Sequence, residues 1–241
     1  MLANLRKDIN KFASKDKAKI LARFFKTGTG NYGEGDKFLG ITVPQTRIVA
    51  KKYKDLTLRN LDILLESKFH EERLLALLIL VNQFEKGSKN KPKIFKFYLS
   101  HTKYINNWDL VDLSADKIVG AYLKDKPKDI LPKLAKSKNL WERRIAIIAT
   151  FHFIKKGQSK YTLKIAKILL KDDQDLIHKS VGWMLREVGK RCSEENLTDF
   201  LDQYAHLMPR TMLRYAIERF GESKRKKYIS IKPQNLEASA K

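Results

Sequence analysis

Asp112 is the residue whose type and position most clearly suggest chemistry, because the sequence pattern predicts an apolar residue where it stands. Helical segments with a small residue recur along the chain, and these small residues are Ala76, Val111, Ala146, Gly182 and Ala216. The positions that follow them hold, in order, Leu77, Asp112, Ile147, Trp183 and Ile217. Burying an unpaired carboxylate costs several kcal/mol, so a core position gives no reason to keep an acid there.

Trp108 and Asp112 are four residues apart, which places an indole and a carboxylate on one face of a helix. Trp183 occupies the repeat position equivalent to Asp112. Cations recur in the same series of helices, and they are Arg143, Arg144, Lys179, Arg186 and Arg214. Cations that neutralise phosphates, interleaved with aromatic rings, suit a sugar-phosphate backbone.

A plainer interpretation of these residues stays open. Asp112 can be an exposed or first-turn aspartate that the helix dipole stabilises. The tryptophans can belong to the core and the arginines to a solvated face. For Trp141, which lies outside the aligned positions, we adopt the core interpretation.

The elements that must position these residues are repeating helix pairs. The gaps between the aligned small residues are 35, 35, 36 and 34 residues, a period typical of short HEAT or armadillo repeats. Apolar residues recur at helical spacing, and breakers such as Asn106-Asn107 and Pro209 separate the segments. The sequence therefore predicts an all-α, right-handed α-solenoid of HEAT-like repeats, whose concave basic groove would carry the aromatic and charged residues named above.

The domain prediction is a single repeat domain over residues 1–221, followed by a basic, polar tail over 222–241 that we expect to be mostly loosely ordered. An N-terminal helix pair at about 4–13 and 16–25 precedes a longer loop at 26–43. Pro44 then stands at a plausible first helical position.

The charge predicts a polyanionic partner. The chain of 241 residues has 50 Lys and Arg against 27 Asp and Glu, a formal net charge of +23. An acidic membrane surface would suit this charge equally well, but the sequence shows no secretory segment, lipidation motif or long apolar run. The single Cys192 fits a reducing compartment. We therefore expect a cytoplasmic, nucleoid-associated monomer without a membrane partner.

Several tempting motifs do not hold up. The run from Gly28 to Gly33 matches the GxGxxG dinucleotide fingerprint, but the residues before it read as a helix, where the motif requires a buried strand. The five histidines are far apart, and none forms a metal-ligand pair at helical spacing. No serine or cysteine stands in a recognisable nucleophile elbow. We therefore expect neither a metal nor a cofactor.

Three motifs in order carry a family resemblance. They are Asn107-Trp108-Asp109-Leu110-Val111-Asp112, then Trp141-Glu142-Arg143-Arg144-x-Ala146, then Gly182-Trp183-x-Leu185-Arg186-Glu187. With these motifs the chain resembles the AlkD-type DNA alkylation repair family of DNA glycosylases over roughly residues 32–220. The resemblance implies a helical solenoid that wraps duplex DNA and removes N3- and N7-alkylated purines.

The resemblance also implies roles for particular residues. Asp112 matches the catalytic aspartate, Trp108 and Trp183 match aromatic residues beside the sugar of the lesion, and Arg144 matches an arginine that contacts the DNA backbone. Tyr32 and Phe38 lie in a matching loop and would contact the lesion strand. The alternative function is a non-catalytic solenoid that binds branched or damaged DNA, or RNA, through the same basic groove. A pure binder would have no use for a lone acid opposite phosphates, which favours the enzyme.

Overall fold

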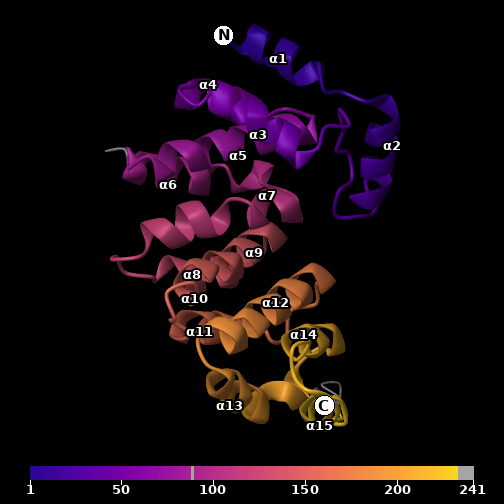
Figure 1. The fold of residues 1–241 in the computed structure, drawn as a ribbon, viewed down its shortest axis with the longest axis vertical. Helices are drawn as coiled ribbons and strands as arrows, with labels where there is room; N and C mark the ends of the chain where they lie inside the picture. Colours follow the sequence, from indigo (N-terminus) through magenta and orange to yellow (C-terminus); the bar gives the residue numbers. More distant parts are fainter. Residues whose placement is uncertain (88–89, 233–241) are drawn as a thin grey trace. The chain divides into compact units, whose positions relative to one another are not determined.

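The computed structural model describes residues 1–87 and 90–232, and helices make up most of this part of the chain (Figure 1). No β-strand forms within these ranges, where strand-type pairing is limited to one isolated bridge between Lys37 and Phe69. The prediction of an all-α fold of helical repeats is confirmed. The handedness of the solenoid and its concave groove stay predictions. The chain divides into two compact units, Met1–Ile118 and Val119–Lys241.

The first unit is built around one long helix, α5. Its helical elements are α1 (Leu2–Asn10), α2 (Lys15–Phe24), α3 (Val43–Lys52), α4 (Leu58–Leu65), α5 (His70–Glu85), α6 (Lys91–Ser100), the 3-10 turn η1 (Thr102–Tyr104) and α7 (Trp108–Asp112). Helix α5 is buried over most of its length, and α3, α4, α6 and α7 all pack against it. A helix that is apolar on nearly every side must be covered in this way, which places α5 at the centre of the core.

Two acids in the first turn of α5 hold the N-terminal segment. The Glu71 carboxylate accepts hydrogen bonds from the backbone N–H groups of Leu39, Gly40 and Ile41, at 2.9–3.1 Å. Glu72 accepts hydrogen bonds from Nε and Nη2 of Arg6 on α1, each at 3.0 Å. Acids at a helix N-terminus are favoured by the helix dipole, so both contacts also stabilise α5.

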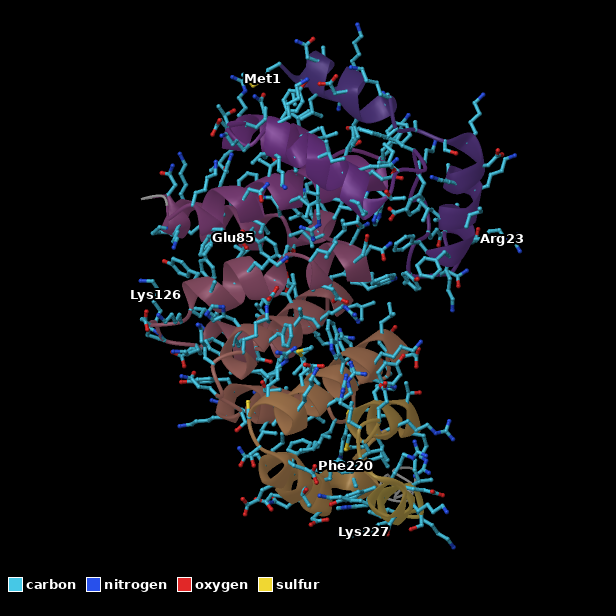
Figure 2. The ribbon with its side chains drawn as sticks, viewed as in Figure 1. Met1, Arg23, Glu85, Lys126, Phe220 and Lys227 are labelled. Carbon is cyan, nitrogen blue, oxygen red and sulfur yellow. The ribbon has the colours of Figure 1, made fainter. Side chains whose placement is uncertain are left out.

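Helix α2 is peripheral to this core. No residue of α2 is buried, and Figure 1 shows it beside the stack of α3, α4 and α5. Figure 2 shows Arg23 pointing away from the remainder of the unit. The chain then enters the loop before α3, close to the predicted bounds, and Pro44 lies in the first turn of α3 as expected.

The second unit is also built around central helices, here α9 and α12. Its helical elements are α8 (Ile130–Ala135), α9 (Leu140–Ala149), α10 (Phe151–Ile154), α11 (Lys160–Ile168), α12 (Asp175–Arg191), α13 (Glu194–Tyr204), the 3-10 turn η3 (Ala205–Leu207), α14 (Arg210–Ala216) and α15 (Glu222–Ile229). The π-helical turn η2 (Asp116–Gly120) spans the boundary between the units. Helix α9 packs on α8 and α12, and α12 packs on α14.

Gly182 shows why one of the aligned positions needs a small residue. A Cβ atom there would lie 2.5 Å from the carbonyl oxygen of Met212 and 2.5 Å from the Cβ of Tyr215, both on α14. Such distances are far inside van der Waals contact, so only glycine lets α12 approach α14 this closely. The small residue at position 182 thus marks the place where α12 and α14 meet.

The C-terminal region is more ordered than the sequence predicts. Residues 222–229 form α15, and Tyr228 is completely buried, with its hydroxyl donating to Asp202 of α13 at 2.8 Å. Arg210 donates to the carbonyl oxygens of Ile229 and Ile231. The burial of Tyr228 therefore holds in place a segment whose basic, polar composition predicts a loosely ordered tail. Residues 233–241 of the predicted tail lie outside the described ranges.

Candidate active site

Asp112 is the last residue of α7. The helix starts after Asn107, whose side-chain oxygen accepts a hydrogen bond from the backbone N–H of Trp108 at 2.8 Å. Asp112 is half-buried, like the equivalent residue Trp183, whereas the other equivalent residues Leu77, Ile147 and Ile217 are buried. The negative end of a helix dipole does not stabilise a carboxylate. The interpretation of Asp112 as a first-turn aspartate is therefore wrong.

Trp108 lies one turn before Asp112 on α7 and belongs to an aromatic cluster. Its ring stacks on Phe25 with centroids 5.2 Å apart, and Phe24 meets it edge-on at 5.9 Å. Phe38 continues the stack, at 5.1 Å from Phe25 and 4.7 Å from the His70 ring. The cluster fixes the indole while leaving Trp108 itself only half-buried.

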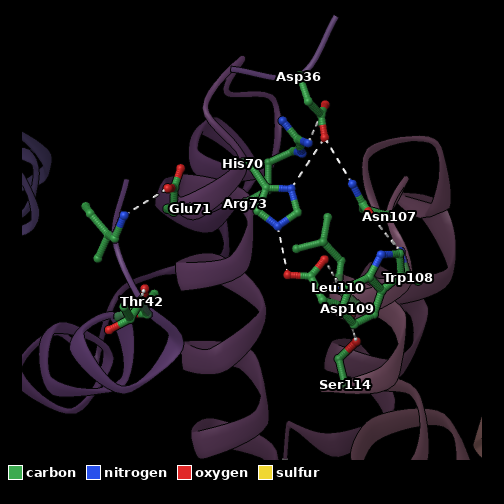
Figure 3. Close-up of polar contacts among 12 residues, drawn as sticks. Asp36, Thr42, His70, Glu71, Arg73, Asn107, Trp108, Asp109, Leu110 and Ser114 are labelled. Carbon is green, nitrogen blue, oxygen red and sulfur yellow. Dashed lines mark hydrogen bonds and ion pairs between the residues drawn. The ribbon is translucent and has the colours of Figure 1, made fainter. Parts of the chain in front are cut away.

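A buried network of charged groups supports the other side of α7 (Figure 3). Nε2 of His70 lies 2.8 Å from a carboxylate oxygen of Asp109, and its Nδ1 lies 3.4 Å from Asp36. Arg73 donates to the other oxygen of Asp36 at 2.7 Å, and Asn107 donates to Asp36 at 3.4 Å. The side chains of His70, Arg73 and Asp36 are 2%, 4% and 6% exposed. Two cations thus face two carboxylates with almost no access to water.

The environment of this network sets its protonation. Burial alone would lower the pKa of His70, but the charge of Asp109 and the hydrogen bonds to Asp109 and Asp36 raise it to about 9. Burial alone would likewise raise the pKa of Asp36. The hydrogen bond to His70 and the charge of Arg73 outweigh burial and hold this pKa below its usual value. At neutral pH the His70 imidazolium and the Asp36 carboxylate are therefore charged, and the network is ionic.

A second contact fixes the other end of α7. The hydroxyl groups of Tyr98 and Ser114 lie 2.9 Å apart, and Ser114 donates to the carbonyl oxygen of Leu110. Burial raises the pKa of Tyr98, and the charges of Asp116 and Asp112 add to this effect. The phenol therefore stays neutral beneath the site. Helix α7 is short, so its geometry depends on these flanking contacts more than on its own hydrogen bonds.

Trp183 lies in the second unit, on α12. It is half-buried, and its ring centroid is 5.9 Å from that of Phe151. Trp141 is buried with 8% of its surface exposed, so the core interpretation of that residue is confirmed.

The predicted DNA-binding cations, all in the second unit, differ in accessibility. Arg143 forms an ion pair with Asp172 at 2.6 Å, and Arg144 is 5% exposed and donates to the carbonyl oxygen of Leu176. Lys179 pairs with Asp175 at 2.7 Å on the surface of α12, and Arg186 pairs with Glu218 and Glu187. Arg214 is exposed. Lys179 and Arg214 are thus better placed to reach a ligand than Arg143 and Arg144.

The glycine-rich loop begins after helix α2, as the sequence indicates, so the strand that a dinucleotide fingerprint requires is missing at this place. Tyr32, within it, is half-buried. The carboxylate of Glu34 accepts a hydrogen bond from the N–H of Gly30 at 2.8 Å. The loop leads directly into Asp36 and Phe38. The hydrogen bond within the loop therefore helps to position one member of the charged network and one member of the aromatic cluster.

The structure brings Trp108, Asp112 and Phe38 into the first unit, with Trp183 and the five cations in the second. Sequence reasoning missed His70, Asp109 and Asp36, because it tested the histidines only as metal ligands. A usable signal was present. His70 and Asp109 are 39 residues apart, which is one repeat of 35 plus one helical turn, and this spacing places their side chains on adjacent helices.

Comparison with known proteins gives a family. The model of the family described as "DNA alkylation repair enzyme" matches residues 5–220, nearly the whole chain. The chain belongs to the DNA alkylation repair enzyme family. No curated relative matches it.

A solved structure, a predicted DNA alkylation repair enzyme from Enterococcus faecalis, is similar with a TM-score of 0.66 and 15% sequence identity. The match covers 87% of this chain and 97% of that one. At this identity the likeness shows a shared fold, which agrees with the family assignment. Across residues 1–87 and 90–232, no helix combines the length and the apolar character that crossing a membrane demands.

Proposed function

We propose that this member of the DNA alkylation repair family is a DNA glycosylase that hydrolyses the N-glycosidic bond of positively charged alkylpurines in duplex DNA. One observation carries the proposal: a half-buried carboxylate, Asp112, stands one helical turn from a half-buried tryptophan, at a repeat position that is otherwise apolar. The buried network around His70 holds the helix that bears both residues. Such supporting contacts are what a preorganised site requires.

The chemistry needs few groups. An N3-alkyladenine or N7-alkylguanine already carries a positive charge, so its glycosidic bond breaks without the general acid that ordinary glycoside hydrolysis requires. As the base departs, C1′ of the deoxyribose develops oxocarbenium character. The electrons of the glycosidic bond leave with the base, which becomes neutral, and water adds to C1′ and loses a proton. No metal or cofactor is needed for this sequence.

Asp112 would act on the sugar cation. A carboxylate about 4 Å from C1′, at an effective dielectric near 20, contributes roughly 4 kcal/mol, or about a thousandfold in rate. The same group can orient the attacking water and accept its proton. Helix α7 suits this role because the contact between His70 and Asp109 holds the helix that bears Asp112 in place.

The remaining contacts follow from the same proposal. Trp108 and Trp183 would pack against the DNA at the lesion, and Lys179, Arg186 and Arg214 would contact phosphates. Tyr32 and Phe38 would support the lesion strand. The burial of Arg143 and Arg144 favours a positioning role for these two, although the family resemblance implies a backbone contact for Arg144. We expect the protein to act as a cytoplasmic, nucleoid-associated monomer.

The decisive experiment replaces the charge of Asp112 and keeps its shape. Asp112→Asn should lower single-turnover excision of N7-methylguanine by roughly 10²–10³-fold, because about 3–4 kcal/mol of transition-state stabilisation disappears. Affinity for DNA should hold or rise slightly, since a negative group beside a polyanion is repulsive in the ground state. Excision rate, equilibrium binding and melting temperature are measured in one buffer at fixed salt.

Asp125→Asn is the matched control, because Asp125 is 84% exposed and the charge change is the same. This variant should excise at the wild-type rate. If Asp112→Asn excises like Asp125→Asn, or loses activity only by unfolding, Asp112 is structural. The alternative function, a non-catalytic binder of damaged DNA or RNA, would then be the better account.

A further inference from the structure

Helix α2 carries an apolar stripe that the core does not use. Ile20 and Phe24 are 65% and 61% exposed, and they are four residues apart on one helix face. Single exposed apolar side chains are ordinary on protein surfaces, as at Ile48 of α3 and Ile63 of α4. A pair stacked along one face of a helix with no buried residue is different, because folding alone gives no reason for it.

The stripe is held in a fixed orientation. The backbone N–H of Ser14, the N-cap of α2, donates to the carbonyl oxygen of Leu39 at 2.9 Å. Gly40, with φ of +82°, lies so close to α2 that a Cβ atom there would be 2.0 Å from the Ser14 carbonyl oxygen. At the other end Phe25 is buried in the aromatic cluster. Both ends of α2 are thus anchored while its apolar face stays open.

The stripe continues into the candidate active site. The ring of Phe24 meets that of Trp108 edge-on, with centroids 5.9 Å apart and an interplanar angle of 71°. Ile20, Phe24 and Trp108 therefore form one apolar path that leads from α2 to the face of α7. Any ligand that packs on Trp108 has this path beside it.

Cations flank the same face. Lys17 and Arg23 lie three residues before and after Ile20, and both are exposed (Figure 2, where Arg23 is labelled). Lys15 and Lys19 add charge to the helix, against the single acid Asp16. An apolar pair between cations suits a ligand with an apolar centre and an anionic edge, which describes nucleobases between their phosphates.

We propose that α2 is a wedge for duplex DNA, in which Ile20 and Phe24 pack against nucleobases next to the lesion nucleotide at Trp108, while Lys17 and Arg23 contact the flanking phosphates. The proposal rests on the proposed function, since it assumes that the ligand at Trp108 is DNA. Apolar side chains commonly insert between base steps and unstack them. Two side chains are too few for a stable protein–protein interface, which needs on the order of 20 residues a side, but they suffice for such a wedge.

The test compares Ile20→Ala with Ile48→Ala. Ile48 is 60% exposed on α3, so the control removes the same atoms from a similar surface position. The probe is a 20-bp duplex with a central tetrahydrofuran abasic analogue, alongside the intact duplex. Ile20→Ala should weaken binding about five- to tenfold with an unchanged salt slope, whereas Lys17→Ala should lower the slope by about one. Ile48→Ala should bind like the wild type.

A fluorescence measurement reports the wedge directly. With 2-aminopurine beside the analogue, wild-type binding should raise the fluorescence because the base unstacks, and Ile20→Ala should reduce this rise. Phe24→Ala serves only as a second variant, because Phe24 contacts Trp108 and its loss would also disturb the candidate active site. This variant should lower the affinity for DNA by about tenfold or more.

The outcomes separate this proposal from the catalytic one. If Ile20→Ala and Ile48→Ala bind equally, or wild-type binding leaves the fluorescence unchanged, the wedge is wrong. The wedge is also wrong if Ile20→Ala abolishes self-association or vesicle binding and leaves the affinity for DNA intact. The apolar face of α2 would then bind a second copy of the protein or a membrane. Weakened DNA binding by Ile20→Ala in a protein that excises no N7-methylguanine would support the wedge and reject the glycosylase.

Discussion

The starts of α5 and α9, one in each unit, share a local motif but use it differently. In each, a Ser-Lys pair is followed by three residues and then by Glu-Arg, at Ser67 to Arg73 and at Ser137 to Arg143. In both, the serine hydroxyl accepts a backbone hydrogen bond from two residues ahead, and the arginine donates back to the serine carbonyl oxygen. Each arginine also pairs with an aspartate, Asp36 or Asp172.

The difference lies in a second buried cation and its position. At α5 this cation is His70, which reaches Asp109 on α7, while position 74 is a buried leucine. At α9 the cation stands one turn later, at Arg144, and reaches the carbonyl oxygen of Leu176 on α12. Both therefore contact the helix that bears a proposed-site tryptophan, Trp108 or Trp183. The local motif sets the start of the helix, and the second cation fixes the next helix to it.

The largest effect should come from His70, because it pairs with the buried carboxyl group of Asp109 at 2.8 Å. His70→Gln should lower the free energy of unfolding by about 3–5 kcal/mol, since it leaves Asp109 without its buried counter-charge. Denaturant titration at pH 6.5 measures the loss. His101→Gln is the matched control: its partner Asp62 is 45% exposed, so the loss should stay below about 1 kcal/mol.

The pH dependence supplies a second readout for the same variant. The folded-state pKa of His70 is raised above its unfolded value of about 6.5. Its stabilising contribution is therefore complete below pH 6.5 and is lost as the pH rises to about 9. This decline should be missing in His70→Gln. Equal pH profiles for variant and wild type would mean that His70 is neutral and that the network of α5 is not ionic.

A smaller effect should come from the shared arginines. Replacement by methionine keeps much of the apolar stem and removes the charge, so it isolates the ion pair. Arg73→Met should cost about 2–3 kcal/mol and Arg143→Met about 1–2 kcal/mol, because the Arg73–Asp36 pair is more deeply buried and belongs to the His70 network. Thermal and denaturant unfolding test the ranking. A larger loss of stability for Arg143→Met than for Arg73→Met would contradict the view that the ion pairs at the start of α5 contribute more to stability than the ion pair at the start of α9.

The two regions also show what the sequence could reveal. The period, the all-α class and the prominence of Asp112 were readable, because small residues at seams and apolar residues at helical spacing are direct consequences of packing. The His70 network was not, since its members come from a loop, α5 and α7, and only the fold brings them together. The helix α15 was missed for the same reason: the burial of Tyr228 against Asp202 outweighs a strongly basic composition.

An effect on stability as small as that at Arg143 is expected at Arg144, and this residue can contradict the comparison. If its role parallels that of His70, Arg144→Ala should lower the free energy of unfolding by about 1–2 kcal/mol, because a buried hydrogen bond to the Leu176 carbonyl oxygen is lost, and should leave the salt slope of DNA binding unchanged. Arg214→Ala, at an exposed position, should do the opposite: it should lower the slope by about one for lesion and undamaged duplexes alike, with stability within about 0.5 kcal/mol of the wild type. If Arg144→Ala itself lowers the slope by about one, the guanidinium reaches a phosphate when DNA binds, as the family resemblance implies. The buried cation of α9 would then be a ligand contact, and only that of α5 a purely structural one.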